Sequence, residues 1–279
     1  MGLGGYLTWT AVARELYTRT GVKCFPLEGH SNLIKPIKSE IFDNNPYIWQ
    51  AFSNLNEKYI LLYLNDSKAN YCKQDTPVKA VHRYDKHIIE QICEVYGILD
   101  PQLKCELYFK EEEFKFKNEL LKDVGNYIVI EPQSNDEYSV NKVYPLEKWQ
   151  LVVDTLLKTG IKIVQVGRKT EDSVLDGIID MTGKTSFREA AAIIEGANLF
   201  VSSEGGLMHA ANAVGTRAVI VYSGFIHPNL TSYSENTNIW AGNKHGPCGM
   251  KIKCQKCSEE MEQHDHNEII NAVIDCVGA

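Results

Sequence analysis

The sequence predicts an α/β protein of two domains, the second of which is doubly wound. Its 279 residues exceed the ~100–150 that are typical of one domain and suit two. The second half alternates short β-branched apolar runs with stretches of helical periodicity, and turns that contain glycine separate them. This alternation is typical of parallel βαβ units, in which helices cover both faces of a sheet.

The elements of the first half are less regular. Those expected, in chain order, are a helix over 6–20, strands over 23–26 and 59–64, a helix over 86–96 and a strand over 105–109. Gly21 and Gly97 follow the two helices, where a glycine commonly ends a helix. Residues 110–122 are rich in charge and are interpreted as the link to the second domain, with a solvated helix face rather than a binding surface.

The elements of the second half are clearer. We expect strands over 127–131, 161–166, 198–201 and 218–222, and helices over 145–158, 186–195 and 207–214. Pro145 in a first turn and Gly160 beyond the last turn are ordinary boundaries of a helix. Open parallel sheets bind ligands at the carboxyl ends of their strands, so functional residues are expected in the turns after strands and in the cleft between two such domains.

Charge and hydropathy exclude several classes of protein. The chain has 29 basic and 36 acidic residues, a net charge of −7, so it offers no chain-wide electrostatic case for binding nucleic acid. No apolar run reaches the ~18–20 residues that span a bilayer, and no signal-peptide pattern is visible at the N-terminus. We therefore expect a cytoplasmic protein without a transmembrane segment, and peripheral association with a membrane stays open.

The strongest motif covers residues 201–211, where a buried strand runs through Ser-Ser-Glu-Gly-Gly into an Ala-rich helix. Gly205 and Gly206 allow the backbone to approach a ligand closely. The free N–H groups of the first helical turn form an anion site that suits a phosphate or diphosphate. Glu204 suits a sugar hydroxyl better than a phosphate, and His209 is a candidate ligand contact or a helix-packing residue.

Further candidate residues lie in the neighbouring turns. They are Lys142, Gln165, Gly167, Glu171, Thr182 and Gly183. The lysine precedes a helix and is placed to reach a diphosphate, unless it is an ordinary surface lysine. The strand end at 165–167 offers a backbone surface for a base, and the threonine and glycine that follow offer a hydroxyl and backbone groups. The glutamate suits a ribose hydroxyl or serves as a charge at a helix start.

The order of these segments resembles glycosyltransferase family 9, the ADP-heptose:lipopolysaccharide heptosyltransferase group. The similarity covers about residues 127–225, with Asn-Lys…Pro…Trp, Val-Gly…Glu, Thr-Gly-Lys-Thr-Ser and Ser-Ser-Glu-Gly-Gly-Leu-Met-His in this order. Residues 2–11 resemble the family's first Gly-rich loop and helix, although the strand that precedes this loop is absent. The resemblance implies a GT-B architecture, two Rossmann-like domains facing a central cleft, with the N-terminal one shortened here.

The resemblance also implies a separate role for each domain. Residues 1–122 would form the acceptor-side domain, and residues 123–279 the nucleotide-sugar domain with a Cys-rich C-terminal segment. Lys142 would contact the diphosphate, and the amides of Gly205, Gly206 and Leu207 would hold the phosphates. Glu204 and His209 would lie near the sugar and phosphate, whereas Thr182, Gly183 and residues 165–167 would line the nucleoside.

The implied reaction is the inverting transfer of a heptose-like sugar from an ADP-heptose-like donor to a glycan or protein acceptor, without a catalytic metal or other cofactor. The family's favoured general base is an Asp at the position of Gly5, so the catalytic base is left unassigned. Asp43 and His87 are substitutes that no motif supports. Two alternatives stay open, a catalytically impaired nucleotide-sugar-binding or scaffold protein and a nucleotide-sugar isomerase. A dinucleotide-dependent oxidoreductase is disfavoured because no Gly-x-Gly-x-x-Gly follows a strand.

Four cysteines gather near the C-terminus: Cys248, Cys254, Cys257 and Cys276. Their spacings are five, two and eighteen intervening residues, and the Cys-x-x-Cys pair is a common half-site for Zn or Fe. Some heptosyltransferases that modify autotransporters are similar in carrying a four-cysteine iron finger. We expect a structural Zn or Fe site, with free thiols or a disulfide as alternatives and with His245, His264 and His266 as other ligands.

Overall fold

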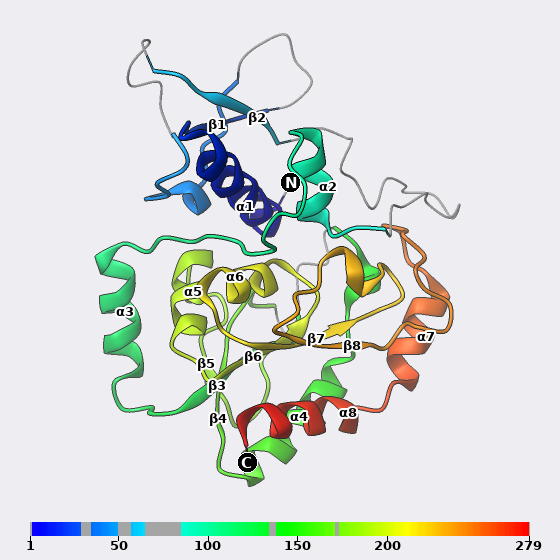
Figure 1. The fold of residues 1–279 in the computed structure, drawn as a ribbon. Coiled ribbons are helices and arrows are strands. Elements are labelled where there is room, and N and C mark those ends of the chain that lie inside the picture. Colours follow the sequence, from blue (N-terminus) through cyan, green and yellow to red (C-terminus); the bar gives the residue numbers. More distant parts are fainter. Residues whose placement is uncertain are drawn as a thin grey trace.

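The computed structural model describes residues 2–28, 35–49, 57–64, 85–133, 138–170 and 173–278. Within these residues the larger sheet has six parallel strands in the order β5-β4-β3-β6-β7-β8 (Figure 1). The strands are β3 (Tyr127–Glu131), β4 (Lys162–Gln165), β5 (Ile179–Asp180), β6 (Leu199–Ser203), β7 (Ala218–Tyr222) and β8 (Thr237–Trp240). The expected doubly wound α/β arrangement is confirmed.

Helices cover both faces of this sheet (Figure 1). One face carries α4 (Leu146–Lys158) and α8 (Asn267–Val277), and the other carries α5 (Phe187–Glu195) and α6 (Gly206–Val214). Successive side chains of a strand point to opposite faces, so Ile128 and Ile130 join the core under α4 and α8, whereas Val129 joins the core under α5 and α6. Burial on both faces explains why these strands are uninterrupted apolar runs.

The N-terminal part packs on top of the α5–α6 layer. It contains α1 (Leu3–Thr20), β1 (Cys24–Leu27), the short 3-10 helix η1 (Glu40–Phe42), β2 (Ile60–Tyr63) and α2 (Ile88–Val95). Strands β1 and β2 pair in parallel, and α1 packs against both α2 and α6 (Figure 1). Gly21 ends α1 in the left-handed conformation, with φ 69°, and its N–H donates to the carbonyl of Tyr17.

The strand expected over 105–109 is not formed. The N–H of Cys105 donates to Asn212 Oδ1 at 2.8 Å, and the N–H of Glu106 donates to Thr10 Oγ1 at 2.8 Å. Side chains of α6 and α1 therefore satisfy the amides that a neighbouring strand would bind. Cys105 and Leu107 are buried in the core that these helices share, whereas Tyr108 packs against Tyr47 and Phe109 against Phe114. The apolar pattern of this run therefore reflects burial without strand pairing.

The charge-rich residues that follow form α3 (Glu111–Leu121), most of which is exposed. Its Glu113 is an exception, because it is buried and receives two hydrogen bonds from Arg188 of α5, at 2.5 and 2.8 Å. The last helices are α7 (Gln255–Gln263), which follows β8 and the cysteine-rich loop, and α8. No helix in the described part of the chain is long and apolar enough to cross a bilayer.

Candidate functional site

The sheet changes direction between β3 and β6. From β3 the chain continues outward to β4 and β5, then returns to β6 on the other side of β3 and continues to β7 and β8. At this switch point Glu131, the last residue of β3, pairs in register with Ser202 of β6. Open α/β sheets bind ligands beyond the carboxyl ends of the strands at such a point. The turn after β6 therefore lies where a ligand is expected.

This turn leads directly into α6. Gly205 is the N-cap residue of α6 and has no side chain to cap the helix, so the amides of the first turn, including Gly206 and Leu207, carry no side-chain cap. Exposed N–H dipoles at a helix N-terminus attract anions. The structure thus places three of the expected phosphate-binding residues at the N-terminus of a nine-residue helix.

The N-terminus of α1 meets the N-terminus of α6. A Cβ atom at Gly4 would lie 2.6 Å from Gly206 Cα and 3.2 Å from His209 Cδ2, so position 4 accepts only glycine without movement of the backbone. Gly5, at the family's Asp position, is in the same first turn of α1 and brings no carboxylate. Because Gly4 contacts Gly206, the positive ends of two helix dipoles lie next to each other. Like α6, α1 has no side-chain cap at this end.

Lys142 and Glu204 form a buried ion pair at this place. Lys142 ends the short 3-10 helix η2 (Val140–Lys142), and its Nζ lies 2.5 Å from Glu204 Oε2. The side chains are 9% and 5% exposed. The ammonium also lies 5.4 Å from the ring centre of Tyr138 and 5.5 Å from that of Phe225. A lysine beside a helix N-terminus is repelled by the dipole, so the Glu204 carboxylate, or an anionic ligand, stabilises this arrangement.

Two other polar groups at the strand ends lack a hydrogen-bond partner among the described residues. Glu131 Oε2 and Ser203 Oγ are buried and have no hydrogen-bond partner among the described residues. Burial raises the pKa of Glu131 to about 8, and the nearby charge of Lys142 partly opposes this. Buried polar atoms are normally paired, so such atoms point to a ligand or ordered water. Sequence reasoning missed Glu131, although its position at the carboxyl end of a buried strand was a usable signal.

His209 is buried on α6 and is held by a tyrosine. Its Nδ1 lies 2.6 Å from Tyr233 Oη, which in turn lies 3.2 Å from Cys105 Sγ. Burial, together with the charge of Lys142, lowers the pKa of His209 to about 3. The imidazole is therefore neutral at pH 7, and it contributes packing and hydrogen bonding rather than positive charge.

Each of the two candidate bases, Asp43 and His87, has at least one side-chain atom already engaged. Asp43 Oδ2 lies 2.8 Å from Lys110 Nζ. His87 is the N-cap residue of α2, where its Nδ1 accepts a hydrogen bond from the N–H of Ile89, and burial lowers its pKa to about 3. Neither arrangement supports a role as a general base.

The residues expected around a nucleoside mostly support local structure. Gln165 donates to the carbonyl of Ser173 at 2.6 Å and accepts from the N–H of Leu175 at 2.9 Å, so both ends of its amide are used. Thr182 Oγ1 donates to Asp180 Oδ1 at 2.6 Å.

Two glycines in the same region supply backbone. Gly167 and Gly183 have φ of 110° and 64°, and Gly167 packs against the Glu131 side chain. What this region offers a ligand is therefore backbone rather than free side chains. Glu171 lies outside the described residues.

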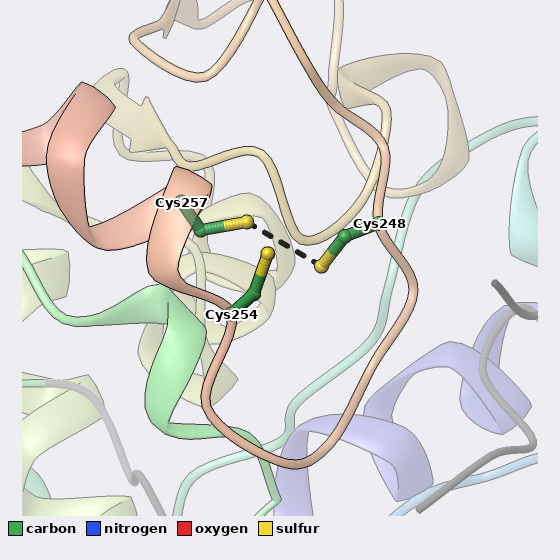
Figure 2. A group of neighbouring side chains, drawn as sticks. All are labelled: Cys248, Cys254 and Cys257. Carbon is green, nitrogen blue, oxygen red and sulfur yellow. Dashed lines mark hydrogen bonds between the residues drawn. The ribbon is translucent and has the colours of Figure 1, made fainter. Parts of the chain in front are cut away.

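Three cysteines converge beyond the carboxyl ends of β7 and β8. The Sγ atoms of Cys248, Cys254 and Cys257 lie within 4.8 Å of one another, with 3.4 Å between Cys248 and Cys257 (Figure 2). Cys254 is the N-cap residue of α7, and Cys257 lies in its first turn, which explains how the Cys-x-x-Cys pair turns both sulfurs to one point. A hydrogen bond from Cys257 lowers the pKa of Cys248 to about 6.

Cys276 does not join this cluster, which corrects the expected set of four cysteines to three. Its Sγ lies 3.6 Å from Arg217 Nη2 and 3.6 Å from Thr237 Oγ1. Thr237 begins β8, so Cys276 is at the amino end of the sheet, opposite to the cluster. His264 is also elsewhere, with Nδ1 3.0 Å from Tyr144 Oη.

Glycines bring the loops around the cluster into direct backbone contact. A Cβ atom at Gly242 would lie 1.8 Å from the backbone nitrogen of Gly224, and one at Gly224 would lie 3.0 Å from Cys257 Sγ. The N–H of Cys248 donates to the carbonyl of Gly224 at 2.6 Å. Thiolates suit Zn and Fe, so three converging sulfurs on a fixed backbone fit such a metal, with one ligand still to be supplied.

The loop between Cys248 and Cys254 is tied to Lys142 through the neighbouring residue, Asn141. Asn141 Nδ2 donates to the carbonyls of Met250 and Ile252 at 2.7 and 2.8 Å. Its Oδ1 accepts from the N–H of Cys254 at 2.7 Å. The loop of residues 248–254 (the cysteine loop) and the helix η2 that carries Lys142 (the lysine turn) therefore share one hydrogen-bond network.

Solved structures with a similar fold come from bacterial glycosyltransferases. A family 9 glycosyltransferase from Veillonella parvula has a TM-score of 0.69 at 15% identity, over 99% of this chain and 94% of that one. The iron-containing dodecameric glycosyltransferase TibC of enterotoxigenic Escherichia coli has a TM-score of 0.66 at 15% identity, and the match covers 100% of this chain and 74% of that one. TibC, described as a heptosyltransferase, has also been solved in complex with ADP-D-β-D-heptose, with a TM-score of 0.65 at 16% identity over 99% and 74%. The fold is thus of the GT-B type.

Sequence relatives agree with the fold. Lipopolysaccharide heptosyltransferase 3 of Escherichia coli K12 is 26% identical over 203 residues, 65% of this chain and 57% of that protein. Lipooligosaccharide heptosyltransferase 2 of Haemophilus influenzae is 26% identical over 182 residues, which are 59% of this chain and 51% of that protein. The chain spans about half the length of the curated relatives it matches. Residues 59–261 match the family model described as glycosyltransferase family 9 (heptosyltransferase). The chain therefore belongs to glycosyltransferase family 9.

Proposed function

We propose that this protein transfers a heptose-like sugar from ADP-heptose, or a close nucleoside-diphosphate analogue, to a glycan or protein acceptor with inversion. The observation that carries the proposal is the buried Lys142–Glu204 pair at the uncapped N-terminus of α6, at the switch point of the sheet. The family membership and the ADP-heptose complex of TibC support this choice of donor.

The geometry suits the departure of a nucleoside diphosphate. As the glycosidic bond breaks, the leaving diphosphate gains negative charge. The amides of Gly206 and Leu207 are held by α6, so they can stabilise that charge without reorganising, and the Lys142 ammonium lies beside them. A diphosphate that binds Lys142 competes with Glu204, whose carboxylate then accepts a hydrogen bond from a sugar hydroxyl. No metal is assigned to this chemistry.

Glu131 belongs to the same proposed donor site. Its unpaired Oε2 is buried at the end of β3, and Gly167 packs against its side chain on the nucleoside side. With a pKa near 8 the carboxyl is largely protonated at pH 7, so it donates as well as accepts hydrogen bonds there. We assign it to a hydroxyl of the donor. Residues 1–122 and 123–279 remain our proposed acceptor-side and donor domains.

Gly5 favours a second candidate function, a nucleotide-sugar-binding protein of low catalytic power. No carboxylate stands at the family's base position, Asp43 is paired with Lys110, and His87 caps a helix. One experiment separates the two functions. Isothermal titration with ADP-heptose and ADP measures binding, and release of ADP with and without bacterial lipooligosaccharide or protein acceptors measures transfer. Binding without acceptor-dependent release supports the second function, and absence of binding contradicts both.

The cysteine cluster completes the proposal. We assign it a structural Zn or Fe, held by Cys248, Cys254 and Cys257. When bound, such an ion would tie the loop after β8 to the start of α7, and so contribute to folding rather than to the chemical step. The iron content of TibC supports this assignment.

A further inference from the structure

We infer that His245 supplies the fourth ligand of a three-cysteine, one-histidine metal site. This inference rests on the proposal that the three cysteines hold a metal, and it is independent of sugar transfer. Structural Zn sites are almost always four-coordinate and tetrahedral, with ligand sets that include three cysteines and one histidine. Three converging sulfurs therefore leave one position to be filled, and Cys276 lies at the opposite end of the sheet.

His245 lines the same cavity as the three cysteines. The other residues around this cavity are Pro247, Met250 and Lys256. The proline side chain has no donor atom, and neither lysine nor methionine is among the usual protein ligands of Zn, which are Cys, His, Asp and Glu. Imidazole suits Zn and Fe, so the chemistry of the lining residues selects His245.

The backbone that carries His245 is fixed beside the cluster. Its N–H donates to Glu260 Oε1 at 2.9 Å, and Glu260 is buried on α7 one turn after Cys257. A Cβ atom at the next residue, Gly246, would lie 2.5 Å from the carbonyl oxygen of Gly242. The loop is therefore held in place, and the exposed imidazole lines the cavity. Its ring nitrogens are not among the ligand atoms that lie within 4.8 Å of one another, so the imidazole would turn toward the sulfurs when it binds an ion.

Glu260 is the competing ligand. Its Oε2 is buried without a hydrogen-bond partner among the described residues. Both Glu260 Oε2 and Cys257 Sγ flank the space beside Gly224, at 3.1 and 3.0 Å from a Cβ placed there. However, Glu260 does not line the cavity, and its other oxygen is occupied by the His245 N–H. We therefore assign Glu260 to positioning the loop.

Charge supports the same assignment. Three thiolates and one neutral imidazole around a divalent ion leave one net negative charge, which Lys256 at the cavity offsets. A fourth anionic ligand such as Glu260 would leave two negative charges in a partly buried place, and this is less favourable.

Cobalt titration tests the inference, because tetrahedral Co²⁺ has visible bands that report the number of thiolate ligands. The reduced chain of 279 residues is titrated anaerobically with Co²⁺ and then with competing Zn²⁺. The wild type should bind one ion per chain with tetrahedral bands. His245→Ala should lower the affinity by roughly 10–100-fold, the range known for lost supporting contacts in metal sites, or more. His245→Cys should recover tight binding with bands shifted to longer wavelength.

Two further variants separate the alternatives. Glu260→Gln keeps an oxygen acceptor for the His245 N–H but removes the carboxylate, and it should leave the cobalt bands unchanged. Cys276→Ser is the matched control and should change neither the affinity nor the bands. Circular dichroism of the metal-free variants checks that each one folds.

Three outcomes would overturn the inference. They are unchanged cobalt affinity and bands in His245→Ala, altered bands in Glu260→Gln, or a wild type that binds neither ion. The last of these would also remove the proposed metal, whereas the first two would leave it intact. None of them decides whether the chain binds or transfers the donor, which is measured separately.

Discussion

Replacing Asn141 by Ala should weaken both the cysteine loop and the binding of ADP. The variant removes hydrogen bonds to the carbonyls of Met250 and Ile252 and from the N–H of Cys254. Met250 keeps its bond from Ser139 Oγ at 3.0 Å, and Ile252 is exposed to water. The dominant loss is therefore the buried N–H of Cys254, an unsatisfied donor that costs about 1–3 kcal/mol.

The effect on ADP follows from the position of Asn141 next to Lys142. If the lost hydrogen bonds destabilise the ADP-binding position of Lys142 by about 1.4 kcal/mol, the affinity for ADP decreases about tenfold. Urea denaturation measures the stability, and isothermal titration measures the affinity. Ser139→Ala is the comparison variant. It removes the bond from Ser139 Oγ to the Met250 carbonyl and the bond that Oγ accepts from the N–H of Asn141, but it leaves the N–H of Cys254 paired with Asn141, so its loss of stability should be smaller than that of Asn141→Ala.

Metal removal extends this test. Chelation should weaken ADP binding in the wild type but not further in Asn141→Ala, because the network that connects the two sites is already broken. By reciprocity, ADP should raise the metal affinity of the wild type by the same factor. An Asn141→Ala protein that is destabilised but binds ADP as the wild type does, and still responds to chelation, would refute the coupling.

Three other substitutions test the donor site. Lys142→Ala should lower ADP affinity roughly ten- to a hundredfold, as expected for a charge-assisted contact, and unchanged affinity by titration would remove the lysine from the site. Gly4→Ala should destabilise the fold by about 1–3 kcal/mol in urea denaturation, because its methyl group meets Gly206 Cα, and an unaffected midpoint would contradict this contact. Glu131 has a folded pKa of about 8, above its ordinary value of 4.5, so the free energy of unfolding should fall as pH rises between these values, by up to about 5 kcal/mol. Glu131→Gln should flatten that pH dependence, and identical profiles for the two proteins would refute the assigned pKa.

The parts of the fold that could be predicted are those that local pattern determines. Strands such as Tyr127–Glu131 and Ala218–Tyr222 are buried on both faces, so their sequences are continuous apolar runs bounded by turn residues. Strand β5 has two residues and β8 is an edge strand of four with half-buried side chains, so neither leaves a clear pattern. The run 105–109 looks like a strand but binds helix side chains, which is a contact between distant parts of the chain.

The candidate site shows the same division. Residues in the turn after β6 were identifiable because a ligand-binding turn needs glycine and a helix N-terminus at fixed spacing. By contrast, the pairing of Lys142 with Glu204, the unpaired Glu131 and the position of Cys276 depend on which strands are neighbours. Spacing along the chain brought Cys276 into the expected metal set, whereas the sheet separates it from the other cysteines by the length of a strand.

The charges at the switch point support the proposal that an anion binds there. The charges of Lys142 and Glu204 cancel each other. Glu131 is largely protonated near pH 7, because burial raises its pKa to about 8. His209 is neutral, because burial lowers its pKa to about 3. What remains are the N-termini of α1 and α6, each equivalent to roughly half a positive charge and brought together by the contact of Gly4 with Gly206. A site with buried positive potential and unpaired acceptors is stabilised by a ligand that carries both negative charge and hydroxyl groups. A nucleoside diphosphate sugar has both, and its charge is largest when the sugar leaves.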